Sequence, residues 1–352
     1  MRLSKLEKKW LLGMVGSILV MIGTPMGSAA ETEEGYEIEI PLGLDEDQFV
    51  VPEDNPLSEE KIELGRLLYF DKRLSADNSI SCSTCHKPEL AFTDGQPVST
   101  GIHWQQGGRS APTSINRGFS KVQFWDGRAS TLEEQSVGPL TNPVEHGFPG
   151  NEDVVAKLNK IEGYKKLFKK AFGTNAISIE QVGKAIASFQ RTLISGNSPF
   201  DRYDYDGEEK AISEAAKRGK NLFFGKARCN LCHFGTNFSD EKFHNIGIGW
   251  DGETVDVGRY HVTHDPKDLA AFKTPTLREI SRTAPYMHDG RFVTLKQVVD
   301  HYNQGGVKNP FLDNQIIPLN LTEAEKQDLV EMLRSLNGEG LQHAIAPLFF
   351  PE

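Results

Sequence analysis

Apolar positions recur at helical spacing in two well-marked segments of this chain. Ser178 and Gln181 form a capping box, and apolar side chains then follow on one face as far as Gly196, where we expect the helix to end. A second capping box begins at Thr322, and the apolar face behind it ends at Gly338. Strand-like alternation is scarce, and loops rich in glycine, proline and asparagine fill much of the remaining sequence. The pattern predicts a mostly α-helical, loop-rich protein.

A faint internal repeat divides the chain. "GRLLYF" (65–70) and "GKNLFF" (219–224) each have the pattern of a helix end, and each precedes a pair of cysteines. The turn-rich, charged stretch 195–209 between them is the best candidate for a domain boundary. We therefore expect an N-terminal domain at 56–205 and a C-terminal domain at 206–345.

The first thirty residues have the pattern of an export signal. Basic side chains precede the apolar run "WLLGMVGSILVMIG", and the small residues "GSAA" follow it. The run is too short for a comfortable membrane span, so 1–30 favours a cleaved signal peptide over an uncleaved anchor. Export of this kind leads to the periplasm. Residues 31–55 are acidic and weakly patterned, and we expect them to form an N-terminal lead-in.

Composition and charge limit the partners of the chain. Its 352 residues suffice for two domains, and its 38% hydrophobic and 25% charged content is ordinary for a globular protein. The net charge of −10 makes nucleic acid and anionic membrane surfaces poor partners. A basic protein partner suits this charge better.

All four cysteines fall in two CxxCH motifs, "CSTCH" at 82–86 and "CNLCH" at 229–233. A disulfide or a thioredoxin-like redox pair leaves the two histidines unexplained, and a zinc site requires cysteine pairs a short loop apart. The remaining interpretation is c-type haem, in which two thioethers fix the haem and the histidine ligates its iron. The predicted attachment and iron-ligating residues are Cys82, Cys85 and His86 for one haem and Cys229, Cys232 and His233 for the other.

Longer motifs around these haem sites resemble a known family. "ELGRLLYFDKRLSADNSISCSTCHKPELAFTDG", "RSAPTSIN", "QFWDGRASTLEEQSVGPLTNPVEHG" and "KTPTLREISRTAPYMHDG" are similar to the bacterial dihaem cytochrome c peroxidases, which include the MauG proteins. The similarity runs from roughly Asn55 to Gly340. It implies two cytochrome c-like, mostly α-helical domains with one c-type haem each, the haems flanking the domain interface.

The resemblance also implies a peroxide site at the N-terminal haem. Family members carry a glutamine and a glutamate ten and twenty residues after the tryptophan of "FWDGR", and here those positions are Trp125, Gln135 and Glu145. Cleavage of the peroxide O–O bond needs a proton to move from one oxygen to the other, which a carboxylate can carry. Gln135 is expected to orient the peroxide by hydrogen bonding. Trp125 is expected to help electrons cross between the haems.

A calcium ion between the domains is a further implication of the resemblance. Ser110, Thr283 and Pro285 align with the positions that hold this ion in relatives. Two of these positions bind through backbone oxygen, which residue type hardly reports. The first is commonly asparagine in the family and is serine here.

The second ligand of the C-terminal haem departs from the peroxidases proper. They place a methionine fourteen residues after the histidine of "APYxH"; counting from His288, that position is Tyr302, as in the MauG branch. A tyrosine oxygen favours the oxidised states of iron, whereas a methionine thioether raises the potential. The alternative is that Tyr302 is a buried aromatic residue and that Met287 or His301 ligates the iron.

A second departure lies in the loop "STGIHWQQGGRS". Many peroxidases ligate the resting N-terminal haem with a histidine of this loop, but the aligned position is Ile102 and His103 comes one place later. If the loop conformation compensates for this one-residue offset, His103 is the ligand of the resting haem. If it does not, the haem is permanently open to peroxide, as in MauG. The remaining histidines have no predicted role beyond hydrogen bonding, although His146 directly follows Glu145.

These features favour a peroxidase that reduces hydrogen peroxide to water with electrons relayed through the second haem. The alternative is a MauG-like oxidant that uses peroxide to oxidise a side chain of a partner protein. A plain electron-transfer cytochrome is a third interpretation, for which the chain is long. The electron donor would be a small cytochrome c or a cupredoxin. Family members are often homodimers, but the sequence shows no interface.

Overall fold

The computed structural model describes residues 36–250 and 255–352. The predicted export signal, the first residues of the lead-in and a short loop lie outside the described residues. Among the described residues, none of the helices combines the length and the apolar content that spanning a membrane requires.

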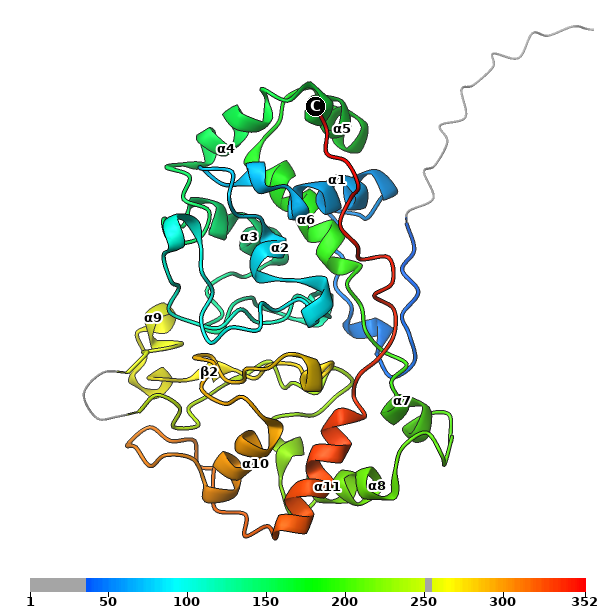
Figure 1. Ribbon diagram of the computed structural model, residues 1–352, viewed down its shortest axis with the longest axis vertical. Helices are drawn as coiled ribbons and strands as arrows, with labels where there is room; N and C mark the ends of the chain where they lie inside the picture. Colours follow the sequence, from blue (N-terminus) through cyan, green and yellow to red (C-terminus); the bar gives the residue numbers. More distant parts are fainter. Residues whose placement is uncertain (1–35, 251–254) are drawn as a thin grey trace, which may run out of the picture. The chain divides into compact units, whose positions relative to one another are not determined.

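Helices and irregular loops make up most of the described chain (Figure 1). The α-helices are α1 (Glu59–Phe70), α2 (Cys82–Cys85), α3 (Leu132–Val137), α4 (Asn151–Leu158), α5 (Glu162–Phe172), α6 (Ile179–Arg191), α7 (Pro199–Asp204), α8 (Glu214–Phe223), α9 (Tyr260–Thr263), α10 (Leu295–Gln304) and α11 (Glu323–Arg334). The described β-structure is one antiparallel pair of two-residue strands, β1 (Phe243–His244) and β2 (Phe272–Lys273). The predicted mostly α-helical class is confirmed.

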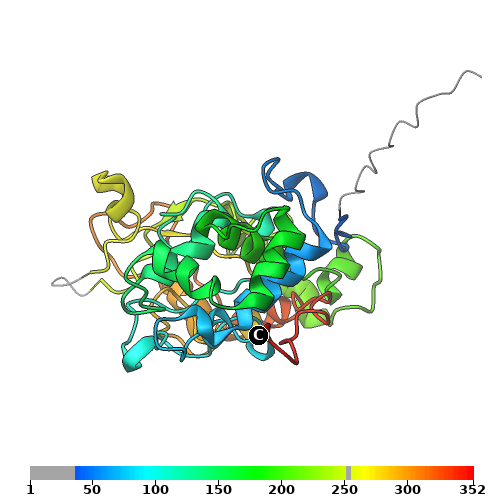
Figure 2. The same ribbon diagram turned by 90° about the horizontal axis from the view of Figure 1, so that it is seen from above.

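Two clusters of buried apolar side chains lie at the two ends of the molecule in Figure 1. The first is built on α1, α4, α5 and α6, and the second on α8, α10 and α11, with β2 between them in the view. In the view from above, the blue and green helices of the first cluster lie around the C-terminal end of the chain (Figure 2). The backbone N–H of Gly163 on α5 donates to the carbonyl of Glu352, 2.6 Å away. The C-terminal segment therefore returns to the first cluster.

The internal repeat corresponds to a repeated packing arrangement. α1 packs on α6 with Gly65 at the crossing, and a methyl group there would overlap the backbone carbonyl of Ala185. α8 packs on α11 with Gly219 at the crossing, and a methyl group there would overlap the carbonyl of Asp328. The leading glycines of "GRLLYF" and "GKNLFF" thus allow the close approach that sets each cysteine motif beside its helix pair.

The predicted helix starts are confirmed, but the predicted ends are not. The Ser178 and Thr322 capping boxes start α6 and α11. α6 ends at Arg191, before Gly196, because Asn116 binds the following backbone: its N–H donates to the Leu193 carbonyl over 2.8 Å. α11 likewise ends four residues before Gly338.

The composition of the stretch 195–209 predicts a linker, but in the structure this stretch is folded and packed. It contains α7, whose Asp201 is fully buried and forms an ion pair with the buried Arg278. Arg278 also donates to the carbonyl of Gly43 in the lead-in, 2.6 Å away. These long-range contacts fix the stretch against both flanking segments. The two-domain division stays a prediction.

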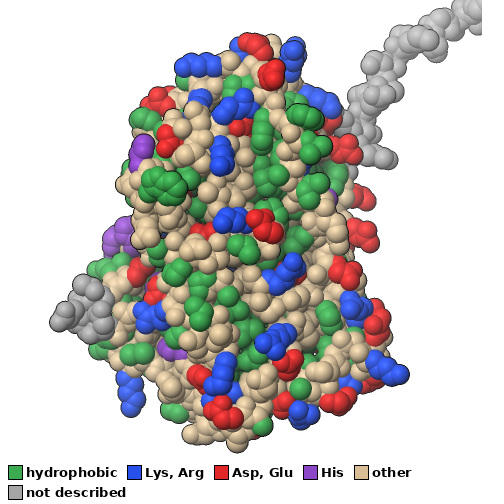
Figure 3. Space-filling view, viewed as in Figure 1, with side chains coloured by type: hydrophobic (Ala, Val, Ile, Leu, Met, Phe, Trp, Pro, Cys, Tyr) green, Lys and Arg blue, Asp and Glu red, His purple; other side chains and the backbone are tan. Residues whose placement is uncertain are grey.

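Basic and acidic side chains are interspersed over the face shown in Figure 3. Neither sign forms a dominant patch there. The net charge of −10 is therefore not concentrated on this face.

Candidate functional site: two cysteine-histidine cavities

The two CxxCH motifs have the same local geometry. Cys82–Cys85 form the short helix α2, and Cys229–Leu231 form a 3₁₀ turn. The histidine after each motif is held through Nδ1 by a backbone carbonyl: His86 by Phe92 at 3.0 Å and His233 by Phe238 at 2.8 Å. A carbonyl partner of this kind fixes the tautomer and the ring orientation of a metal-binding histidine. In both motifs Nε2 is the nitrogen left to bind iron.

All four cysteines are free thiols in this structure, and no disulfide joins them. Burial raises the pKa of Cys82 and of Cys229 to about 12, and that of Cys85 to about 11. Thiolates are the reactive form in redox exchange and in zinc binding, so these surroundings disfavour both. Half-buried, neutral thiols beside an oriented histidine fit thioether attachment of a haem, which needs no charged sulfur.

A cavity of about 580 Å³ opens in front of the first motif. It brings together six of the residues predicted from sequence: Cys82, Cys85, His86, Trp125, Gln135 and Glu145. They come from α2, from α3 and from two loops that the chain separates by up to about sixty residues. The lining combines an iron-binding nitrogen with an acid and an amide.

Glu145 lies in the turn after α3, among groups that keep it in place. Its Oε1 accepts a hydrogen bond from the side-chain nitrogen of Asn142, 2.8 Å away. Burial raises the pKa of Glu145, against smaller opposite effects from Arg128 and Asn142. A carboxyl group with a raised pKa can both take and return a proton. His146 also lines the cavity, and its Nδ1 is bound to the carbonyl of Leu74 at 2.6 Å.

Gln135 sits on α3 at the edge of the same cavity. Its carbonyl oxygen is 3.4 Å from the amide nitrogen of Gln190. Its own amide nitrogen has no hydrogen-bond acceptor among the described residues. That nitrogen is therefore available to a ligand in the cavity.

A second cavity, of about 230 Å³, lies in front of the other motif. Cys229, Cys232 and His233 line it together with Tyr302 from α10 and Met287. The Tyr302 hydroxyl has no hydrogen-bond partner among the described residues, and burial raises its pKa. The half-buried phenol thus faces the second cavity with a hydroxyl that a ligand there could bind.

The two alternatives to Tyr302 differ in position. His301 is outside the lining of the second cavity, and its Nε2 is 2.9 Å from the carbonyl oxygen of Ile246. Met287 lines the cavity, as Tyr302 does. Tyr302 and Met287 are thus the candidates that the cavity geometry favours.

Trp125 borders both cavities. Its indole Nε1 donates to the carbonyl of Ser110 at 2.9 Å, and the N–H of Ser110 donates to the carbonyl of His288 at 2.7 Å. Thr283 and Pro285 line the second cavity with Ser110. The three residues predicted for calcium therefore all line the second cavity, and of these Ser110 contacts Trp125.

The loop histidine points away from the first cavity. The His103 side chain is 68% exposed, and its Nδ1 is 3.8 Å from a carboxylate oxygen of Asp77. Ile102 is buried and its side chain packs against Gly147, but neither Ile102 nor His103 lines the first cavity. In this structure, therefore, neither the aligned residue nor the histidine one place later reaches the cavity of His86.

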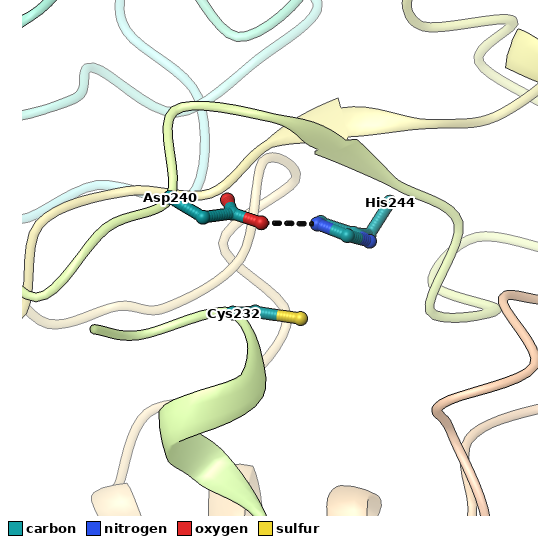
Figure 4. Close-up of side chains that lie close together, drawn as sticks. All are labelled: Cys232, Asp240 and His244. Atoms are coloured by element: carbon teal, nitrogen blue, oxygen red, sulfur yellow. Dashed lines mark hydrogen bonds and ion pairs between the residues drawn. The ribbon is translucent and has the colours of Figure 1, made fainter.

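A cysteine, an aspartate and a histidine meet beside the second cavity (Figure 4). His244 Nε2 pairs with Asp240 at 3.0 Å, and its Nδ1 pairs with Asp313 at 2.6 Å. Cys232 is the third member of the cluster, and its sulfur is the predicted thioether to a haem. Both imidazole nitrogens are occupied by carboxylates, so we interpret His244 as a paired cation rather than a metal ligand.

Several residues of the site were not predicted from the sequence. Asn142 and Arg128 act on Glu145, and both fall inside the motifs quoted above, so their motif membership was a usable signal. Arg117 and Lys273 line both cavities; Lys273 opens the last quoted motif and Arg117 directly follows "RSAPTSIN", but no predicted role marked either residue.

Comparisons with known proteins agree with this geometry. The family model described as di-haem cytochrome c peroxidase matches residues 59–210. The methylamine utilization protein MauG of Methylophilus methylotrophus is 40% identical over 300 residues, covering 84% of this chain and 88% of that protein. The cytochrome c551 peroxidase of Pseudomonas aeruginosa is 34% identical over 334 residues and covers 92% of each chain.

A solved structure gives the same result for the fold. The crystal structure of a MauG-like protein associated with microbial copper homeostasis matches with a TM-score of 0.78 and 34% identity, covering 89% of this chain and 98% of that one. Fold and site together define a haem-dependent oxidoreductase of the peroxidase class. The chain belongs to the di-haem cytochrome c peroxidase family, which includes MauG.

Proposed function

We propose that this protein is an exported peroxidase that reduces hydrogen peroxide to water in the cavity of His86. One observation carries the proposal: Glu145 and Gln135 line the same cavity as the Cys82–Cys85 motif and its histidine. Two c-type haems are proposed, one held by Cys82, Cys85 and His86 and the other by Cys229, Cys232 and His233. When bound, the haem iron supplies the electrons and the binding position for peroxide.

The residues around the first cavity would handle the protons. Glu145 would take a proton from one oxygen of hydrogen peroxide and deliver it to the other, so that cleavage of the O–O bond releases water. Two electrons and two further protons complete the conversion of one peroxide into two waters. The free amide nitrogen of Gln135 would donate a hydrogen bond to the bound peroxide and hold it in place. The side-chain nitrogen of Asn142 donates a hydrogen bond of 2.8 Å to the Glu145 carboxylate and so keeps it oriented.

Electrons would reach the first cavity through the region that the two cavities share. Trp125 borders both, and its backbone carbonyl accepts a hydrogen bond from the N–H of Lys273 on β2 at 2.8 Å. A small cytochrome c or a cupredoxin is the proposed donor. A calcium ion held by Ser110, Thr283 and Pro285 is proposed to stiffen this region.

A second function is favoured by Tyr302. Its phenol faces the second cavity without a protein partner, which suits an iron ligand that stabilises oxidised states. Together with an outward-facing His103, this supports a MauG-like role, in which peroxide drives the oxidation of a side chain on a bound protein. The relatives include proteins named MauG and proteins named cytochrome c peroxidase.

The setting of the protein is also part of the proposal. The apolar N-terminal segment would act as a signal peptide that directs the chain to the periplasm. There the chain would fold as two cytochrome c-like domains, 56–205 and 206–345, with the haems on either side of their interface. A homodimer is the proposed assembly.

Turnover with and without a protein donor tests the two functions. The holoprotein would be mixed with peroxide and with a reduced small cytochrome c. Steady oxidation of the cytochrome supports the peroxidase. If the cytochrome stays reduced while peroxide is consumed and tyrosine or tryptophan side chains of added proteins are modified, the MauG-like role takes its place.

A further inference from the structure

Two basic side chains lie where the two cavities meet. Arg117 follows Asn116 in a short 3₁₀ turn, and Lys273 ends the strand β2. Both residues line the first cavity and the second. Lys273 is only 4% exposed, and burial lowers the pKa of both side chains.

Only one side chain of this pair has a carboxylate at ion-pair distance among the described residues. Lys273 Nζ is 3.1 Å from a carboxylate oxygen of Glu241. Arg117 has no carboxylate at ion-pair distance among the described residues. Its Nε donates to the side-chain oxygen of Gln123 at 2.8 Å, and one terminal nitrogen donates to the carbonyl of Val122 at 3.3 Å. Both of these partners are uncharged.

Neighbouring charged groups are already occupied. Asp240, which also acts on Lys273, is paired with His244. Glu241 accepts from the hydroxyl of Ser120 as well, at 3.1 Å. The half-buried guanidinium of Arg117, on which Glu241 acts only at longer range, is therefore left without a direct carboxylate partner among the described residues. A buried charge without a counterion is costly, and the remaining guanidinium N–H groups have no acceptor in the described protein.

We propose that Arg117 and Lys273 bind propionate carboxylates of the haems at the junction of the two cavities. The inference rests on the proposed function, because it needs a haem in each cavity. A guanidinium matches a carboxylate with two parallel hydrogen bonds, and an ammonium provides a compact charge. Both residues approach the cavities beside Trp125, so the same contact would orient the two haems toward the shared indole.

The pair would also set the redox balance of the haems. A positive charge near a haem stabilises the ferrous form, which carries one positive charge less than the ferric form. Loss of one such charge at about 10 Å and an effective dielectric constant of about 20 should shift the ferrous–ferric equilibrium by roughly tenfold. For a one-electron couple, tenfold corresponds to about 59 mV.

The experiment uses the holoprotein and four variants. Arg117→Gln and Lys273→Gln remove one charge each, Lys273→Arg keeps the charge, and Lys267→Gln removes an exposed lysine as a matched control. Haem content is measured first, by the pyridine haemochrome method. Potentials are then measured by spectroelectrochemistry, and the propionate bending bands by resonance Raman spectroscopy.

Both glutamine variants should lower the potential of at least one haem by about 59 mV and shift the propionate bands. Lys273→Arg should preserve the potential, and Lys267→Gln should change neither quantity. If a glutamine variant fails to bind its haems, Arg117→Lys serves instead. This change keeps the charge but removes the bidentate guanidinium, so it should shift the propionate bands without shifting the potential. Bands and potentials that match the control would overturn the inference.

Two further outcomes separate the alternatives. If the wild-type potential depends on added chloride or phosphate while the bands stay fixed in every variant, a small free anion occupies the site and the propionate inference is wrong. Fewer than two haems in the wild-type protein would contradict the proposed function itself. Two haems with unmoved propionate bands would contradict only this inference.

Discussion

The replacement of Glu145 by glutamine removes the proposed proton carrier and little else. The amide has almost the same size as the carboxylate. In the wild-type protein the side-chain nitrogen of Asn142 is 2.8 Å from Glu145 Oε1, and it can donate the same hydrogen bond to the glutamine oxygen. Gln135 and His146 stay in the cavity lining. The change therefore isolates proton transfer from the shape of the site.

The expected loss follows from what a positioned acid–base group contributes. Such groups accelerate reactions by about 100-fold to 10,000-fold. The bimolecular rate constant with peroxide should fall by this factor, which corresponds to about 3 to 5 kcal/mol of activation free energy. Because burial raises the pKa of Glu145 above its usual 4.5, the wild-type rate should rise with pH through that pKa. The variant should lose this rise.

Stopped-flow mixing of the oxidised holoprotein with excess peroxide measures this rate. Glu152→Gln, an exposed carboxylate on α4, is the matched control and should react as the wild type does. A Glu145→Gln rate within about threefold of the wild type would refute the proton-carrier role. A low rate with an unchanged pH profile would assign Glu145 to shaping the cavity.

Three further predictions concern the second cavity and the core. Tyr302→Met should raise the potential of the second haem by on the order of 100 mV, because axial ligands tune haem potentials widely; an unchanged potential and optical spectrum would show that Tyr302 is not a ligand. Arg278→Met leaves the fully buried Asp201 without its partner and should lower the free energy of unfolding by about 3 to 5 kcal/mol in denaturant titrations. Arg218→Met removes an exposed guanidinium from its pair with Asp328 and should lower the free energy of unfolding by much less, so equal losses would contradict this reasoning. Hydrogen bonds to the carboxylates of Asp240 and Asp313 raise the pKa of His244 above its unfolded value of 6.5. The folded protein therefore holds the extra proton between the unfolded and the folded pKa, and the stabilisation is lost as pH rises through the folded pKa. The stability difference between wild type and His244→Gln should therefore shrink by at most about 1.4 kcal/mol per pH unit in that window, and a difference independent of pH would contradict it.

Local sequence signals predicted the parts of the fold that depend on local interactions. The capping boxes at Ser178 and Thr322 start helices because their side chains bind backbone N–H groups three residues away. The helix ends were wrong because distant residues decide them. Asn116 binds the backbone after α6 from a loop more than seventy residues earlier. Asp201 likewise lies in a stretch whose composition predicts a linker, and its ion pair with the distant Arg278 is visible only in the folded structure.

The candidate site shows the same division. Glu145, Gln135 and Trp125, which the long motifs singled out, line one cavity, and their catalytic roles stay predictions. The sequence did not predict a role for Arg117 or Lys273, because only the folded chain brings both residues to the lining of the two cavities. The sequence left the position of His103 open, and the structure turns its side chain outward toward Asp77.

Rapid mixing of the fully oxidised holoprotein, never reduced, with one equivalent of hydrogen peroxide tests the central claim most directly. Neither Ile102 nor His103 lines the first cavity, so the site of His86 should already be open to peroxide. We predict a fast optical and EPR change at the N-terminal haem without any added electron. No reaction until one electron has been supplied would contradict the account, because the site would then be closed in its resting state.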